Sequence, residues 1–160
     1  MSIRVASVAN KMPPLTGRPI RVEMRPSLGP HLAASSIPKR LILLDVEVLT
    51  RRGDFERILI HEIFHFVWVS LGNPRRREWE NLLAAEISAG VRGELGWSAE
   101  WRKGKLPVGW RRYICESFCD SAAWLWSGLA LHDEFTLASP ARRARKKWLE
   151  QELSIGPVRI

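Results

Sequence analysis

The segment Ile58–Val69, which reads ILIHEIFHFVWV, constrains the fold of this chain more than any other stretch. It contains no Gly or Pro, so a helix can run through it, and apolar residues on all sides indicate that this helix is buried. Three ionisable side chains, His61, Glu62 and His65, interrupt the apolar run. Such groups are costly in a buried helix unless they are paired or bind an ion.

The spacing of these three residues predicts a metal site. Residues four apart lie one turn apart on the same helix face, which places the two imidazoles about 5–6 Å apart at their Cβ atoms. Glu62 lies roughly 100° around the helix from His61, where its carboxylate can take a proton from a metal-bound water. This H-E-x-x-H pattern is typical of a Zn²⁺ site with the Glu as general base. The alternative is two core histidines satisfied by hydrogen bonds and a Glu in an ion pair.

A catalytic zinc site needs three protein ligands and an open position for water, so another donor is required. We expect Glu116, because Asp120 follows four residues later on the same predicted helix and can hydrogen-bond a ligating imidazole. Glu86 is the alternative third ligand, and the carboxylate that does not bind the metal should pair with an arginine. Cys115 and Cys119 are either soft zinc ligands or small core residues, and their spacing within one helix does not suit a disulfide.

Peptide hydrolysis would also need a donor for the oxyanion that develops on the attacked carbonyl. Tyr113, the only tyrosine, lies three residues before Glu116 and is the first candidate. Arg112 and His132 are the other options. Tyr113 could equally be a packing residue at the start of its helix.

The rest of the chain predicts an α+β fold, with strands first and helices after them. Alternating apolar residues predict strands at 18–25 and 40–49, and six prolines exclude a long helix from residues 1–40. Asp54 is the expected N-cap of the motif helix and Gly72 its stop. Further helices are expected from Asn73–Pro74, over 111–126, and from Pro140 to about Leu153. The Gly- and Trp-rich segment 90–109 is expected to be a loop with one short helical turn that overhangs the site.

Length and composition suit one folded domain. With 160 residues, 46% hydrophobic residues and eight Trp, the chain can bury a sizeable core. We expect a single domain over 1–160, with its core at about 18–131 and a basic helical tail at 140–160. The apolar run is too short to cross a bilayer and the first residues lack a signal-peptide pattern, so no membrane partner and a cytoplasmic location are expected.

The net charge of +8 arises from scattered basic clusters, among them Arg75–Arg77 and Arg142–Lys147. Such a surface favours an acidic protein partner or nucleic acid. No helix-turn-helix, RNA-binding or Cys/His finger pattern accompanies it, so nucleic acid is not favoured. A solvated basic surface is the commoner explanation.

The motif His61-Glu-Ile-Phe-His65, followed by the Glu116-x-x-x-Asp120 helix, resembles the zincin metallopeptidases of the gluzincin type. With the preceding strand and the two alanines after Asp120, it is similar to the ImmA/IrrE-type peptidases over roughly residues 40–130. The resemblance implies a zincin-like fold, in which a small N-terminal sheet packs on the active-site helix and a helical half follows. It also implies zinc held by His61, His65 and Glu116, water activated by Glu62, and a peptide or protein substrate. The chain departs from this family in the long interval between His65 and Glu116.

Two other functions remain open. One is a non-catalytic protein with a structural or vestigial metal site that binds an acidic protein or nucleic acid through its basic surface. The other keeps the metal but hydrolyses a small amide, which no feature of the sequence separates from peptide hydrolysis.

Overall fold

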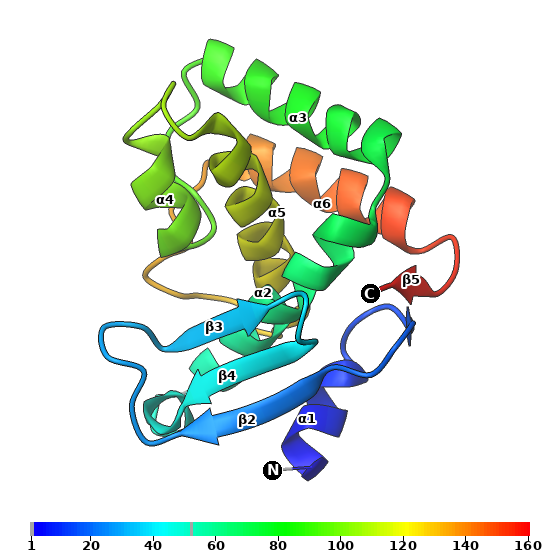
Figure 1. Cartoon of the computed structure of the whole chain (residues 1–160). Helices are drawn as coiled ribbons and strands as arrows, with labels where there is room; N and C mark the ends of the chain where they lie inside the picture. Colours follow the sequence, from blue (N-terminus) through cyan, green and yellow to red (C-terminus); the bar gives the residue numbers. More distant parts are fainter. Residues whose placement is uncertain (1, 52) are drawn as a thin grey trace.

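The computed structural model describes residues 2–51 and 53–160 and has the expected mixed α+β architecture (Figure 1). Its helices are α1 (Ser2–Ala9), α2 (Asp54–Ser70), α3 (Asn73–Ser88), α4 (Trp97–Lys103), α5 (Trp110–Trp126) and α6 (Ser139–Leu153), with a 3₁₀ helix, η1, at Val46–Leu49. The strands are β1 (Leu15–Thr16), β2 (Arg21–Arg25), β3 (Ala33–Ser36), β4 (Leu41–Asp45) and β5 (Val158–Arg159).

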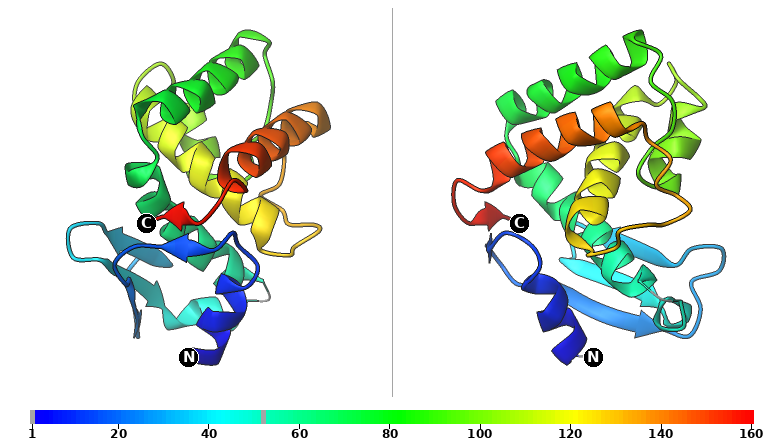
Figure 2. Two further views of the ribbon diagram at one scale, coloured as in Figure 1. Left: turned by 90° about the vertical axis from the view of Figure 1, so that its right-hand side faces the viewer. Right: turned by 180° about the vertical axis from the view of Figure 1, so that it is seen from behind.

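A three-stranded sheet with the order β2-β4-β3 packs against α2. The pairing of β2 with β4 is parallel and that of β3 with β4 is antiparallel, so β3 is an edge strand. Ile42 and Leu44 of β4 are fully buried. Helices α3, α5 and α6 lie on the opposite side, so that α2 runs between the sheet and the other helices (Figures 1 and 2).

The central position of α2 follows from its composition, since Leu59, Ile60, Phe64 and Phe66 have no exposed surface. Its predicted extent is confirmed, but its N-cap is not the expected Asp54. Gly53 occupies the cap in a left-handed conformation (φ 83°) without a side-chain cap bond. Asp54 is the first helical residue, and its carboxylate pairs instead with Arg57 at 3.3 Å.

Four elements near the N-terminus differ from the sequence-based expectation. Helix α1 and the short strand β1 were not expected. Strand β3 was also missed, because its sequence Ala-Ala-Ser-Ser has little intrinsic strand preference. The strand predicted at 40–49 ends at Asp45, whose carboxylate accepts the backbone N–H of Glu47 (2.9 Å) and of Leu28 (2.8 Å). The bond from Glu47 caps η1, which takes the place of the second half of the strand.

The C-terminal segment is part of the fold. Leu149 and Leu153 of α6 are buried in the main core, and β5 pairs in parallel with β1 through Val158 and Leu15. The exposed basic residues of α6, Arg143, Lys146 and Lys147, therefore lie on a helix whose other face packs against α3 and α5. Among the described residues, no helix has the length and apolar character needed to cross a membrane.

Candidate metal centre

Helices α2 and α5 pack closely against each other and bring three predicted ligands together. The rings of His61 and His65 are 5.0 Å apart between centroids. Oε2 of Glu116 lies 3.2 Å from Nε2 of His61 and 3.9 Å from Nε2 of His65. One carboxylate oxygen from α5 therefore faces the same nitrogen of both imidazoles on α2.

Asp120 holds His61 from the side away from Glu116. Its Oδ1 lies 2.7 Å from Nδ1 of His61, and its Oδ2 accepts the backbone N–H of Ala99 at 2.9 Å. Gly96 lies against this carboxylate so closely that a Cβ there would be 2.2 Å from Cγ of Asp120. The start of α4 thus fixes Asp120, which in turn fixes the ring of His61 with its Nε2 directed at Glu116.

The two cysteines lie beside the other nitrogen of His65. Sγ of Cys115 and Sγ of Cys119 are each 3.5 Å from Nδ1 of His65. Donor atoms of His61, His65 and Cys119 also lie within 4.8 Å of one another, so this largely buried group could hold a metal ion. The site therefore offers a carboxylate on one side of His65 and a thiol on the other, and a divalent cation fits this donor chemistry.

The electrostatics of the cluster indicate a deficit of positive charge that a cation would supply. Burial opposes the charge on His61, but the carboxylates of Asp120 and Glu116 outweigh it and raise the pKa of His61 well above its usual value. Burial acts to raise the pKa of Glu116, but the histidines and Arg102 outweigh it, so this pKa is lowered. Both shifts have the same physical cause, the close approach of the imidazoles to the carboxylates of Asp120 and Glu116.

The pKa values of the two thiols shift in opposite directions. A hydrogen bond from Cys119 is the main influence that lowers the pKa of Cys115 to about 6; burial opposes it, and His65 adds to the lowering. Burial and the neighbouring thiol raise the pKa of Cys119 well above its usual value. Cys115 is therefore the thiolate of the pair at neutral pH.

A cavity of about 280 Å³ opens beside His61 and is lined by Glu62. Its walls include Ile58 of α2, Trp97 and Ser98 of α4, and the chain entering the edge strand β3 at Leu32 and Ala33. Glu62 is 8% exposed, so its carboxylate reaches the cavity from a mostly buried position. The predicted general base and one predicted ligand thus face the same space.

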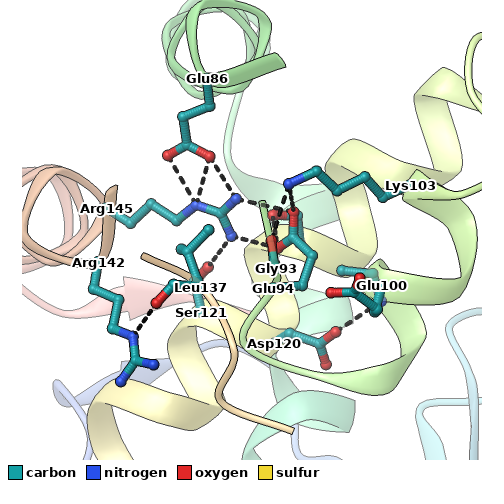
Figure 3. Close-up of polar contacts among 12 residues, drawn as sticks. Glu86, Gly93, Glu94, Glu100, Lys103, Asp120, Ser121, Leu137, Arg142 and Arg145 are labelled. Atoms are coloured by element: carbon teal, nitrogen blue, oxygen red, sulfur yellow. Dashed lines mark hydrogen bonds and ion pairs between the residues drawn. The ribbon is translucent and has the colours of Figure 1, made fainter. Parts of the chain in front are cut away.

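Glu86 and Tyr113 do not join this group but a separate buried network. Figure 3 shows Glu86 and Glu94 of this network on either side of Arg145. Two nitrogens of Arg145 bind the carboxylate of Glu86, with Nη2 at 2.6 Å and Nε at 3.1 Å. Arg145 also binds Glu94 at 2.6 Å, and Glu94 accepts the hydroxyl of Tyr113 at 2.6 Å. Tyr113 is fully buried, so the oxyanion role expected of it has no basis in the geometry. Glu86 pairs with an arginine, as expected for the carboxylate that does not lie beside the histidines.

The other oxyanion candidates are also placed elsewhere. Nε2 of His132 faces Asp54 at 3.4 Å, and Arg112 is exposed on α5. A cation that the sequence-based reasoning missed contacts the site: Nη2 of Arg102 lies 3.3 Å from Oε1 of Glu116. Arg102 was missed because it lies in the segment 90–109, which was expected to be a loop.

Arg145 could have been found from the sequence, since it stands four residues after Ala141 and four before Leu149 on one apolar helical stripe. An arginine on such a stripe predicts a buried ionic partner.

Comparison with known proteins finds no family model, no curated protein and no solved structure that matches this chain. Its function is therefore inferred from the geometry of the site alone.

Proposed function

We propose that this chain is a zinc-dependent metallopeptidase with a zincin-like fold, in which His61, His65 and Glu116 bind the metal. The observation that carries the proposal is that Nε2 of both histidines faces one carboxylate oxygen of Glu116. The opposite nitrogens are held from behind by a carboxylate and by thiols. Two His and one Glu form a ligand set of catalytic zinc sites, which keep one position open.

The chemistry follows from the placement of Glu62. When bound, zinc would polarise a scissile carbonyl and lower the pKa of a water molecule to about 7. Glu62 adjoins His61 in the sequence and lines the cavity, so its carboxylate can accept the proton of the attacking water and pass it to the leaving amine. Arg102, through its contact with Glu116, keeps that carboxylate oriented and places a cation next to the reacting groups.

The cavity favours a peptide substrate over a small amide. The chain at Leu32 and Ala33 lines it and continues into β3, whose outer edge has no neighbouring strand among the described residues. An extended peptide can pair with such an edge through its backbone, which a small amide cannot do. The substrate backbone would then pass between β3 and the metal site.

Metal content and peptide cleavage test this proposal together. The wild type is expected to hold one zinc per chain and to cleave members of a peptide library. Glu116→Ala should lose the metal, Glu86→Gln should keep it, and Glu62→Gln should keep the metal and lose cleavage. A zinc-loaded wild type that cleaves no peptide, or full cleavage by Glu62→Gln, would overturn the assignment.

A structural metal site is the second candidate, and the position of Cys119 favours it. The donor atoms of Cys119 and the two histidines lie close enough to hold an ion, and one further protein ligand would close such a zinc shell and leave no position for water. Such a protein would act as a binding module through its basic surface. Cobalt substitution separates the two cases, because a thiolate ligand gives a charge-transfer band that Cys119→Ser removes. The peptidase proposal expects no such band.

A further inference from the structure

A second cavity, of about 430 Å³, lies at the C-terminal end of α2 and is rich in arginine. Arg76 and Arg77 of α3 and Arg111 of α5 line it, together with Trp68 of α2. One acidic residue, Glu80, shares the wall, and its carboxylate accepts the indole N–H of Trp110 at 2.7 Å. Three guanidinium groups against one carboxylate give the cavity a net positive charge.

The three arginines are not equally engaged. Arg76 donates to the backbone carbonyl of Val69 at 2.7 Å, and its guanidinium lies 5.7 Å from the centre of the Trp68 ring. Arg77 and Arg111 are exposed, and neither forms an ion pair within the described part of the chain. Two uncompensated cations thus flank one that is fixed in place, an arrangement suited to an anionic group.

This cavity and the metal centre lie on the same face of α2. Ile58, His61, His65 and Trp68 follow the spacing of a single helical stripe, and Ile58 and Trp68 line the two different cavities. From the middle of the histidine pair to Trp68 is five residues, or about 7.5 Å along the helix axis. An extended peptide advances about 3.3 Å per residue, so this distance corresponds to roughly two residues.

We infer that this arginine-lined cavity is a substrate subsite that binds an acidic side chain about two residues from the scissile bond. The inference rests on the proposed peptidase function and assigns its substrate class: peptides or proteins with Asp or Glu at that position. A cavity of about 430 Å³ with a Glu in its wall, aligned with the metal centre, suits a single carboxylate better than a nucleic-acid backbone, which needs an extended basic track.

Peptide binding to the Glu62→Gln protein tests the subsite without cleavage of the ligand. A labelled peptide with one Glu moved along its length is compared, by fluorescence anisotropy, with its Gln and Lys counterparts. The Glu peptide in the correct register should bind about tenfold more tightly than the Gln peptide at low salt, because two charge pairs are gained. The preference should shrink as salt is added.

Three double variants show where the preference arises. Arg77→Met with Arg111→Met should abolish it, and Arg77→Glu with Arg111→Glu should shift it to the Lys peptide. Arg143→Met with Lys147→Met, which removes the same charge from the surface of α6, is the matched control and should leave the preference intact. Equal loss in the control pair would show a general charge effect and would refute the subsite.

The outcomes separate the subsite from the proposed function. Cleavage of peptides without any preference for acidic residues would overturn the subsite and leave the peptidase intact. An acidic preference that depends on Arg77 and Arg111, in a protein that cleaves nothing, would support the subsite as a binding site and overturn the peptidase. Tighter binding of a short single-stranded oligonucleotide than of any acidic peptide, lost in the same variants, would overturn the assignment to peptides.

Discussion

Replacing Arg145 by Met should destabilise the protein more than any other single substitution of an arginine in α6. Arg145 has no exposed surface, and its guanidinium compensates the buried carboxylates of Glu86 and Glu94 (Figure 3). Removal of one partner from a buried ion pair costs roughly 3–5 kcal/mol, because the remaining charge is left without compensation. Lys103 still lies 3.4 Å from Glu94, but among the described residues no second cation pairs with Glu86. We therefore expect a loss of about 4–5 kcal/mol.

The measurement is urea denaturation followed by circular dichroism, with thermal unfolding beside it. For a chain of this size each kcal/mol shifts Tm by about 2–4 °C, so a fall of about 8–20 °C is expected. Arg143→Met is the matched control, since Arg143 is exposed, and it should change stability by less than about 0.5 kcal/mol.

A triple variant distinguishes uncompensated charge from lost packing. When Arg145→Met is combined with Glu86→Gln and Glu94→Gln, neither buried carboxylate remains charged. Only Lys103, at the edge of the network, loses a partner, so much of the lost stability should return. If Arg145→Met costs less than about 1 kcal/mol, or if the triple variant is no more stable than the single one, the pairing of Arg145 with Glu86 and Glu94 is not what stabilises this region.

Three further predictions concern the metal centre. Gly96→Ala should lower zinc affinity about 10–100-fold by displacing Asp120, measured by competition with a chelator, whereas Gly104→Ala, where a Cβ meets only ordinary contacts, should not. In the metal-free protein the alkylation rate of Cys115 should rise through pH about 6, since its thiolate forms there, and a midpoint near that of a free thiol, about 8.5, would contradict the lowered pKa. Because the raised pKa of His61 favours its protonated form, zinc binding should release a proton; calorimetry in buffers of different ionisation enthalpy measures this release, and Asp120→Asn should reduce it.

Helix α2 and the shared face of Glu116 and Asp120 on α5 could be predicted, because both depend on the spacing of residues close together in the sequence. The apolar run around His61 and His65 has one compatible structure, a buried helix, and the structure has it at Asp54–Ser70. The four-residue spacing of Glu116 and Asp120 placed both on one face of the next long helix. What the spacing could not decide was which thiol or carboxylate approaches which nitrogen of His65, because that depends on how the two helices are rotated against each other.

Features that depend on long-range contacts were missed. Strand β3 exists because β4 offers it hydrogen bonds, and nothing in Ala-Ala-Ser-Ser indicates a strand. Tyr113 was assigned from its distance in sequence to Glu116, yet its hydroxyl donates to Glu94 in a separate buried network and does not face the histidines. Glu94 itself had no sequence signal, since a lone acid between glycines is ordinary in a solvent-exposed loop.

The long segment between His65 and Glu116 holds two residues of the candidate metal site in place. The backbone of Ala99 holds Asp120, and the side chain of Arg102 holds Glu116. The same segment is anchored through Glu94 to Arg145 on α6. The outer contacts of the candidate metal site thus depend on a helix that supplies none of its donor atoms. A chain that lacked α6 would leave Glu94 without its arginine, so both the fold and the geometry at Asp120 should require the C-terminal segment.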